Sequence, residues 1–159
     1  MILGVDPGVH GALAFFDVTA GHLDIIDMPS IAAGTKSKRI VDEAALVSCL
    51  DDTRPHIQHA FVERVGAMPH QGVTSCFSFG QSYGVVLGVL AALRVPFTTV
   101  RPHRWKAALL VPAAKDGARA RASQLMPAFS RLWPLVKHDG RAEAALIAYY
   151  GAAFSSTSS

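Results

Sequence analysis

Two acidic residues open the last apolar run of the chain, KHDGRAEAALIAYYG, which spans residues 137–151. Asp139 and Glu143 are four positions apart, so on a helix their carboxylates share one face and repel each other by roughly 0.2–0.5 kcal/mol. That face continues through Leu146 and Ile147, so Glu143 is predicted to point inward, and no cation stands three or four residues away. An inward carboxylate without a partner is unfavourable, which favours a metal ion or a cleft edge at this position.

Two further acids come at the ends of predicted strands. Asp6 follows MILGV, and Glu63 follows HAFV. Sites in α/β sheets form at strand ends beside crossovers, so Asp6 and Glu63 would lie side by side if these strands are neighbours. Asp139 and Glu143 would then need only to dock nearby. Carboxylates gathered in one cleft do not all stay ionised without compensation, and two Mg²⁺ ions would supply it. Such a pair of ions activates a water and steadies the leaving oxygen in phosphodiester hydrolysis.

Each of these acids also has an explanation that involves no metal. Asp6 precedes Pro-Gly and is a good turn former, and Glu63 could pair with a neighbouring cation. Asp139 is predicted to be the N-cap of the last helix. A capping box would place its acid at Ala142, so Glu143 does not complete one. The Asp-Pro-Gly turn could also cradle a phosphate, as in actin-like kinases, but this chain is much too short for a two-lobed kinase.

Apolar runs and turn residues predict the elements that position these acids. The predicted strands are residues 1–6, 12–18, 23–28, 59–65 and 95–100, and the predicted helices are residues 42–50, 73–94, 101–109, 114–126 and 137–151. Residues 29–40 are predicted to be a loop, and Asp42 to cap the first helix. The antiparallel start followed by parallel crossovers predicts an α/β fold in which helices cover both faces of a five-stranded mixed sheet.

Three glycines recur every four residues in the long helix. Gly80, Gly84 and Gly88 therefore share one face, although each costs a helix interior up to about 1 kcal/mol relative to alanine. Such a stripe predicts the close approach of another backbone. Two interpretations stay open: packing on the chain's own sheet, or packing against a second subunit.

The charge of the chain is unevenly divided. Residues 1–100 hold six Lys or Arg and nine Asp or Glu, a net charge of −3, whereas residues 101–159 hold nine and three, a net charge of +6. A basic C-terminal part favours a polyanionic partner such as nucleic acid, although a solvated basic surface would have the same composition.

The remaining composition favours a cytoplasmic protein with one domain, residues 1–154, and a disordered tail, residues 155–159. Cys49 and Cys76 have no CxxC spacing and are predicted to be small buried residues rather than a disulfide. Asp6 interrupts the N-terminal apolar run, so we expect no signal peptide. The longest apolar run, residues 83–93, is shorter than the ~20 residues of a membrane span.

Five segments together resemble the RuvC family of Holliday junction resolvases, in the family's order. They are GVDPGVHGALAFF, FVERV, FSFGQSYGVVLGVLAAL, VRPHRWKAAL and HDGRAEAALIAYYG, and the resemblance covers residues 1–151. It implies a ribonuclease H-like fold with three layers, α/β/α, in a single RuvC-like nuclease domain. The acid four residues before Glu143 looks more like the phage-type and chloroplast resolvases, because the better-known bacterial ending has two Asp three residues apart.

The resemblance also implies an activity and a site. Asp6, Glu63, Asp139 and Glu143 would be the catalytic metal ligands, holding two Mg²⁺ ions for which Mn²⁺ substitutes. The protein would be a homodimer that binds a four-way DNA junction, uses no small-molecule cofactor and nicks two opposed strands symmetrically. The products would carry 5′-phosphate and 3′-hydroxyl ends. A C₂ dimer with two identical sites independently suits a two-fold junction.

Phosphate contacts would come from the basic C-terminal part. Lys106 is similar to a basic position near the family's active site and could stabilise charge on the scissile phosphate, although a solvated Lys is the alternative. The other DNA-binding candidates are Arg101, Arg104, Lys115, Arg119, Arg121, Lys137 and Arg141, with Gln71, Phe77 and Phe79 near the strand crossover. One of the two phenylalanines is expected to be core, and the sequence does not decide which.

Two other functions remain open. A non-catalytic junction-binding module of the same fold would bind DNA without nicking it. A ribonuclease H-like hydrolase would cleave linear RNA–DNA hybrids faster than junctions.

Overall fold

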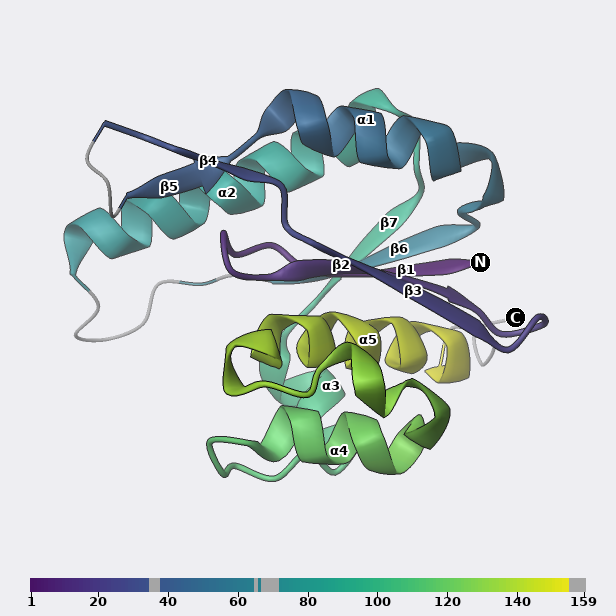
Figure 1. The fold of residues 1–159 in the computed structure, drawn as a ribbon. Coiled ribbons are helices and arrows are strands. Elements are labelled where there is room, and N and C mark those ends of the chain that lie inside the picture. Colours follow the sequence, from purple (N-terminus) through teal and green to yellow (C-terminus); the bar gives the residue numbers. More distant parts are fainter. Residues whose placement is uncertain (35–37, 65, 67–71, 155–159) are drawn as a thin grey trace.

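The computed structural model describes residues 1–34, 38–64, 66 and 72–154 (Figure 1). The predicted tail, residues 155–159, and Gln71 lie outside the described residues.

A five-stranded mixed sheet forms the middle layer, as predicted. Its strands are β1 (Ile2–Asp6), β2 (Ala12–Asp17), β3 (His22–Asp27), β6 (His59–Glu63) and β7 (Phe97–Val100). They lie in the order β3-β2-β1-β6-β7. β1, β2 and β3 pair antiparallel, which confirms the meander, and β6 pairs parallel with both β1 and β7.

Helices cover both faces of this sheet, which confirms the three-layer arrangement (Figure 1). α1 (Glu43–Thr53) and α2 (Val73–Ala92) lie on one face. α3 (Pro102–Ala108), α4 (Gly117–Leu125) and α5 (Asp139–Phe154) lie on the other. Three short 3₁₀ helices, η1 (Arg54–His56), η2 (Pro127–Leu132) and η3 (Val136–His138), connect them. Asp42 caps α1 as predicted, since its Oδ1 accepts the Ala45 N–H at 3.0 Å.

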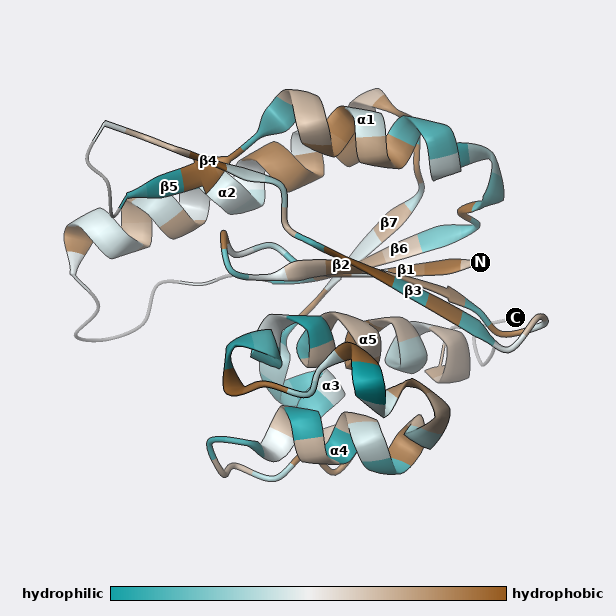
Figure 2. Ribbon diagram, viewed as in Figure 1, coloured by the Kyte–Doolittle hydropathy of each residue, from teal (hydrophilic) through white to brown (hydrophobic). Residues whose placement is uncertain are grey.

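Alternation along the central strands divides the apolar side chains between two cores. Leu3 and Val5 of β1 face the α1–α2 side, whereas Ile2 belongs to the cluster with α3, α4 and α5. Figure 2 shows the strands of the sheet carrying much of the hydrophobic colour between the two helical layers. The sheet is therefore buried on both faces in its middle, which fixes the register of the strands that end in acids.

Small residues let α5 lie directly on β1. A Cβ atom at Gly4 would collide with the carbonyl oxygen of Ala144 and with Ala148. A Cβ at Gly151 would likewise strike the ring of Phe61 on β6. The close approach of helix and sheet therefore depends on glycines outside the α2 stripe.

The α2 stripe does not pack on the sheet. Gly80, Gly84 and Gly88 are exposed, and a Cβ added at any of them would meet nothing within 4 Å. The first of the two interpretations of this stripe is therefore wrong. By length and composition α2 could cross a membrane, whereas the run of residues 83–93 alone is too short. The most apolar window of α2 is only 22% buried.

Three smaller expectations are corrected. Residues 29–40 contain two short strands, β4 (Ser30–Ala32) and β5 (Arg39–Val41), which pair as a hairpin instead of a plain loop. Strands of three residues are too short for their alternation to stand out from the surrounding Pro, Gly and Ser. Asp139 is the first helical residue of α5 rather than its N-cap, because η3 runs directly into the helix. The cysteines are free, but both are only partly buried.

Candidate active site

The parallel pairing of β1 with β6 brings Asp6 and Glu63 together. Val5 pairs with Val62, so the next residue of each strand is an acid, at the same end of the sheet. The sequence left open whether the strands that end in Asp6 and Glu63 are neighbours, and the structure places them side by side. Asp6 also turns back on its own loop, where its Oδ1 accepts the Gly8 N–H at 3.2 Å.

The first turn of α5 packs against the Asp6 loop through Gly140. A Cβ at this position would lie 2.5 Å from the carbonyl oxygen of His10, 2.8 Å from the Cα of Gly11 and 3.0 Å from Oδ2 of Asp6. Only a hydrogen side chain permits that approach. Gly140 therefore brings the turn that carries Asp139 and Glu143 against the strand ends.

Lys106 joins this group from α3. Its Nζ donates to Oε1 of Glu143 at 2.6 Å, and it also lies 5.0 Å from the ring centroid of Trp105. The expectation that Glu143 has no partner is wrong, because the partner comes from a distant part of the chain instead of from its own helix. Lys106 thus places a cation among the four carboxylates.

Trp105 was not identified from the sequence. Its indole N–H donates to Oε1 of Glu63 at 3.0 Å, and its side chain is fully buried. A buried indole N–H needs an acceptor. From the sequence alone, only this general rule could have indicated the bond of Trp105. Trp105 fixes the orientation of the Glu63 carboxylate.

Burial and mutual repulsion raise the pKa values of three acids. Burial raises the pKa of Asp6 to about 7, with the charges of Glu143 and Glu63 adding to the effect. Burial and Glu143 also raise the pKa values of Glu63 and Asp139. Burial lowers the pKa of Lys106, but the hydrogen bond and charge of Glu143 outweigh it and raise the pKa overall. Titratable groups perturbed together in this way are typical of functional sites.

The chemistry of these side chains fits divalent metal ions. Oδ1 of Asp139 is buried and has no hydrogen-bond partner among the described residues, and a bound cation would supply one. Carboxylate oxygens are the ligands that Mg²⁺ prefers. As oriented, however, no three Asp, Glu, His or Cys side chains in the described ranges could share one ion. Oε1 of Glu143 already accepts from Lys106, so an ion that binds through this oxygen has to displace the ammonium.

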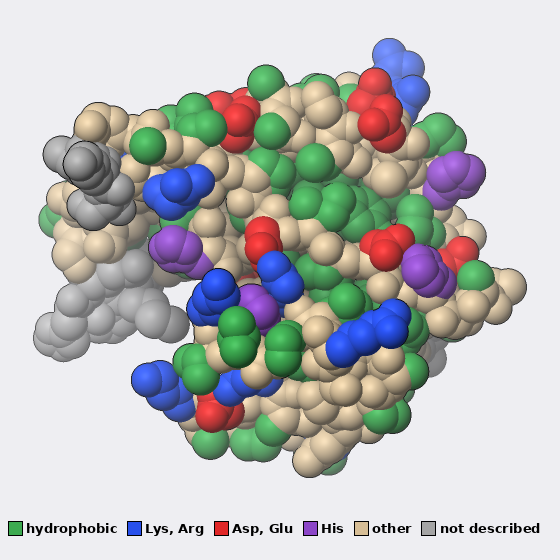
Figure 3. Space-filling model, viewed as in Figure 1, with side chains coloured by type: hydrophobic (Ala, Val, Ile, Leu, Met, Phe, Trp, Pro, Cys, Tyr) green, Lys and Arg blue, Asp and Glu red, His purple; other side chains and the backbone are tan. Residues whose placement is uncertain are grey.

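Apart from Lys106, the predicted DNA-binding cations fall into two groups. Arg101, Arg104, Lys115 and Lys137 are exposed, and their side chains make no hydrogen bond to the described residues. Figure 3 shows several Lys and Arg side chains in the left half of the face it draws, with others at the upper and lower right. The remaining three already bond within the protein: Arg119 to Asp116, Arg121 to Leu109 and Gln124, and Arg141 to Asp27 and Leu132.

Neither predicted phenylalanine lies in the core. Phe77 is 72% exposed and Phe79 is 40% exposed, so the expectation that one of them is buried is wrong. The tip of the Phe79 ring lies 3.6 Å from where a Cβ of Gly8 would be, beside the turn that follows Asp6. Both rings sit in the first two turns of α2, at the same end of the sheet as the acids.

Comparison with known proteins supports one architecture. No family model matches the sequence, and no curated protein does. Among the solved structures that match, two match over nearly the whole of both chains. RuvC of Thermus thermophilus in complex with a Holliday junction substrate is 16% identical, with a TM-score of 0.66, and the match covers 99% of this chain and 96% of that one. A second T. thermophilus RuvC structure is 18% identical, with a TM-score of 0.58, and the match covers 98% and 95%.

The chain has the RuvC fold. At identities of 16% and 18%, the similarity to these structures shows the fold and no more. The subtype suggested by the spacing of Asp139 and Glu143 stays a prediction.

Proposed function

We propose that this protein is a Holliday junction resolvase, a metal-dependent endodeoxyribonuclease that acts in DNA recombination and repair. The observation that carries the proposal is the meeting of Asp6, Glu63, Asp139 and Glu143 at one end of a RuvC-fold sheet. The neighbour of this fold that was solved with a Holliday junction substrate supports the choice of DNA structure. The spacing of the last two acids supports a relation to the phage-type and chloroplast resolvases.

The proposed ligands are the four carboxylates, with two Mg²⁺ ions per site and Mn²⁺ as a substitute. Bound ions would activate a water and neutralise charge on the phosphate. The Asp139 oxygen that lacks a partner among the described residues would be one ligand, and Trp105 holds Glu63 in place. Lys106, which donates to Glu143, would supply a positive charge beside the scissile phosphate, where it would stabilise the developing oxyanion. The products would carry 5′-phosphate and 3′-hydroxyl ends.

A homodimer would place two such sites symmetrically about the two-fold axis of a junction. The exposed face of α2 supports this proposal, since it combines apolar Val73 and Phe77 with the stripe Gly80, Gly84 and Gly88. An apolar helix face of this kind is normally covered, and a stripe without side chains permits close approach of a second helix. For a cytoplasmic protein, a subunit interface would cover this apolar face of α2.

DNA arms would be held by the exposed cations Arg101, Arg104, Lys115 and Lys137, with Phe77 and Phe79 near the crossover. Arg119, Arg121 and Arg141 would have to break contacts within the protein to reach phosphates, so we propose for them a weaker part in binding. A contact between Gln71 and DNA stays a prediction.

The experiment that tests the function is incubation with a synthetic four-way junction and Mg²⁺, with the nicks mapped at nucleotide resolution. A resolvase produces paired nicks in opposed strands. Binding of the junction without nicks would favour the non-catalytic module, and faster cleavage of a linear RNA–DNA hybrid would favour the ribonuclease H-like alternative.

A further inference from the structure

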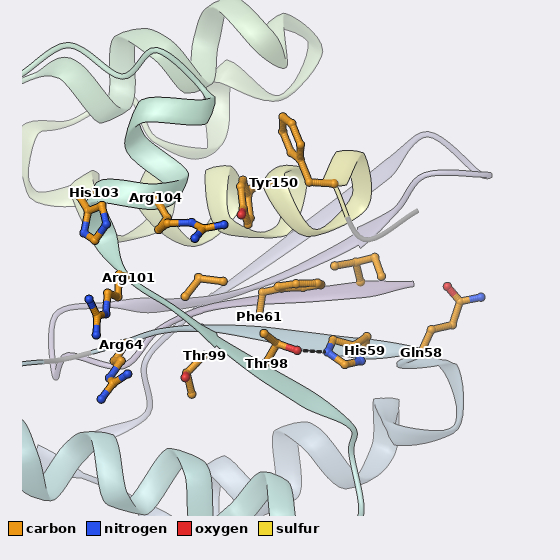
Figure 4. Close-up of a pocket in the computed structure, with 13 residues that line it drawn as sticks. Gln58, His59, Phe61, Arg64, Thr98, Thr99, Arg101, His103, Arg104 and Tyr150 are labelled. Carbon is orange, nitrogen blue, oxygen red and sulfur yellow. Dashed lines mark hydrogen bonds between the residues drawn. The ribbon is translucent and has the colours of Figure 1, made fainter. Parts of the chain in front are cut away.

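A groove of about 800 Å³ runs along β7, which is an edge strand of the sheet. Its walls come from β6, β7, α3 and the C-terminal half of α5 (Figure 4). The groove is distinct from the cluster of acids, since none of the four carboxylates lines it. One end nevertheless adjoins that cluster along the chain: Arg64 directly follows Glu63, and Arg101 precedes the helix that carries Lys106.

Cationic side chains gather at this end. Figure 4 shows Arg64, Arg101, His103 and Arg104 on the same side of the groove, away from Gln58 at the other end. All four are exposed, and the three guanidinium groups donate to no acceptor among the described residues. Their donors are therefore open to an anion, and a planar guanidinium suits the oxygens of a phosphate.

Aromatic rings continue from the cations along the groove. The rings of His59 and Phe61 are 5.0 Å apart, and those of Phe61 and Tyr150 are 6.4 Å apart in an edge-on arrangement. Tyr150 and Phe154 stack at 5.1 Å with an interplanar angle of 27°. Tyr150 is partly exposed, and Phe154 is 46% exposed, so both offer surface to a ligand.

We propose that this groove binds an unpaired stretch of one or two nucleotides, with phosphates on the arginines and a base against Tyr150 and Phe154. Cations beside aromatic rings are the pattern of single-strand binding sites, because every base has a face that stacks. A volume of this size falls within the roughly 300–1,000 Å³ of small-ligand sites and is too small for a duplex. An acidic peptide would satisfy the arginines but would leave the rings without a flat partner.

The binding itself does not depend on nuclease activity. Its role rests on the proposed function: a site beside the acids would hold a strand that has left its duplex near the cut. The site adds Arg64, His103, Tyr150 and Phe154 to the residues that contact nucleic acid, and none of these belongs to the predicted set.

The test is binding of a (dT)₈ oligonucleotide that carries one 2-aminopurine, measured in EDTA so that no strand is cut. We expect fluorescence of the 2-aminopurine to change on stacking. Phe154→Ala should weaken binding at least fivefold and abolish most of that change, and Phe154→Trp should retain both. Arg64→Ala combined with Arg104→Ala should weaken binding at least tenfold and flatten its salt dependence. Arg131→Ala, an exposed arginine on η2, is the matched control and should bind as the wild type does.

Two results would overturn the proposal. One is oligonucleotide binding that the groove variants leave unchanged. The other is a hexaglutamate peptide that competes with (dT)₈ as well as unlabelled (dT)₈ does, which would identify a general anion site. Junction nicking by the same preparations separates the two proposals: if nicking persists while the groove binds no single strand, this inference fails alone.

Discussion

The Nζ atom of Lys106 lies 2.6 Å from Oε1 of Glu143, so a protein ammonium stands where the proposed metal ligand would need a cation. The pair is partly sheltered, with 39% of the Lys106 side chain and 18% of the Glu143 side chain exposed. A divalent ion and Lys106 therefore compete for the same carboxylate.

Replacing Lys106 by methionine should tighten metal binding while slowing nicking. The change keeps most of the length of the side chain, removes its charge and frees Glu143. We expect Mn²⁺ or Mg²⁺ to bind severalfold more tightly, measured by calorimetry, and junction nicking to fall by roughly 10²-fold through loss of the cation near the phosphate. Lys115→Met, at an exposed lysine before α4, should leave metal affinity unchanged. Equal or weaker metal binding by Lys106→Met would contradict the competition.

Asp6→Asn should stabilise the metal-free protein at alkaline pH. The pKa of Asp6 is raised to about 7 in the fold, above its ordinary value of 3.8. Its protonated form therefore contributes stability at pH below about 4, and that contribution is lost as the pH rises through about 7. At pH 8 the ionised carboxylate destabilises the fold by up to about 4 kcal/mol, which asparagine avoids.

Thermal denaturation in EDTA measures this difference. The melting temperature of Asp6→Asn should exceed that of the wild type by several degrees at pH 8, and the two should converge at pH 4. Asp52→Asn, at an exposed position of α1, is the control. A lower melting temperature for Asp6→Asn at pH 8 would contradict the burial of a repelled carboxylate.

Trp105→Phe should impair nicking more than its effect on stability explains. The variant keeps a buried aromatic ring but leaves Glu63 without the indole donor. Trp133 offers a matched control, since it is equally buried and its indole donates to Oγ of Ser123 at 2.9 Å. Both variants should lose about 1–2 kcal/mol of stability, measured by urea denaturation. Only Trp105→Phe should lower the nicking rate by tenfold or more. Equal nicking rates for the two variants would show that Trp105 has no part in the site.

Gly140→Ala should move the start of α5 away from Asp6. The new methyl group would lie 2.5 Å from a backbone oxygen and 2.8 Å from a backbone carbon, and neither can rotate away. We expect the free energy of unfolding to fall by about 1–3 kcal/mol, measured by denaturation. The free energy of metal binding should fall by more, measured by calorimetry. Gly66→Ala, where a Cβ meets nothing within 4 Å, should change neither. Unchanged metal affinity in Gly140→Ala would show that the position of α5 does not matter to the site.

Gly84→Arg should separate the proposed dimer without unfolding its subunits. Nothing lies within 4 Å of a Cβ at Gly84, so the isolated chain has room for the side chain. Analytical ultracentrifugation should give a dimer for the wild type and a monomer for the variant, with unchanged circular dichroism. A wild-type protein that is monomeric at micromolar concentration would refute the interface.

Much of the fold was predictable because its signals are local. Each strand of the main sheet is an apolar run closed by turn residues, and Asp42 is followed by a helical pattern that it caps. The β4–β5 hairpin was missed because three-residue strands carry too little alternation. The start of α5 was misplaced because η3 continues into it without a capping break.

Contacts between distant segments were less predictable. Acids at strand ends were visible in the sequence, but the partner of Glu143 comes from 37 residues away, and that of Glu63 from 42 residues away. The glycines show the same limit: Gly80, Gly84 and Gly88 form the conspicuous repeat, whereas the close packing depends on the isolated Gly4 and Gly140. Periodicity indicates a shared face but not what lies against it.

Nicking of a synthetic four-way junction tests the central claim most directly. Wild-type protein, Asp6→Asn and Glu143→Gln are each incubated with the labelled junction and Mg²⁺, and binding is measured in parallel. The account predicts symmetric nicks by the wild type, ends that a ligase seals, and a loss of at least 10³-fold in both variants with junction binding retained. Binding by the wild type without any nick, or full activity of either variant, would contradict it.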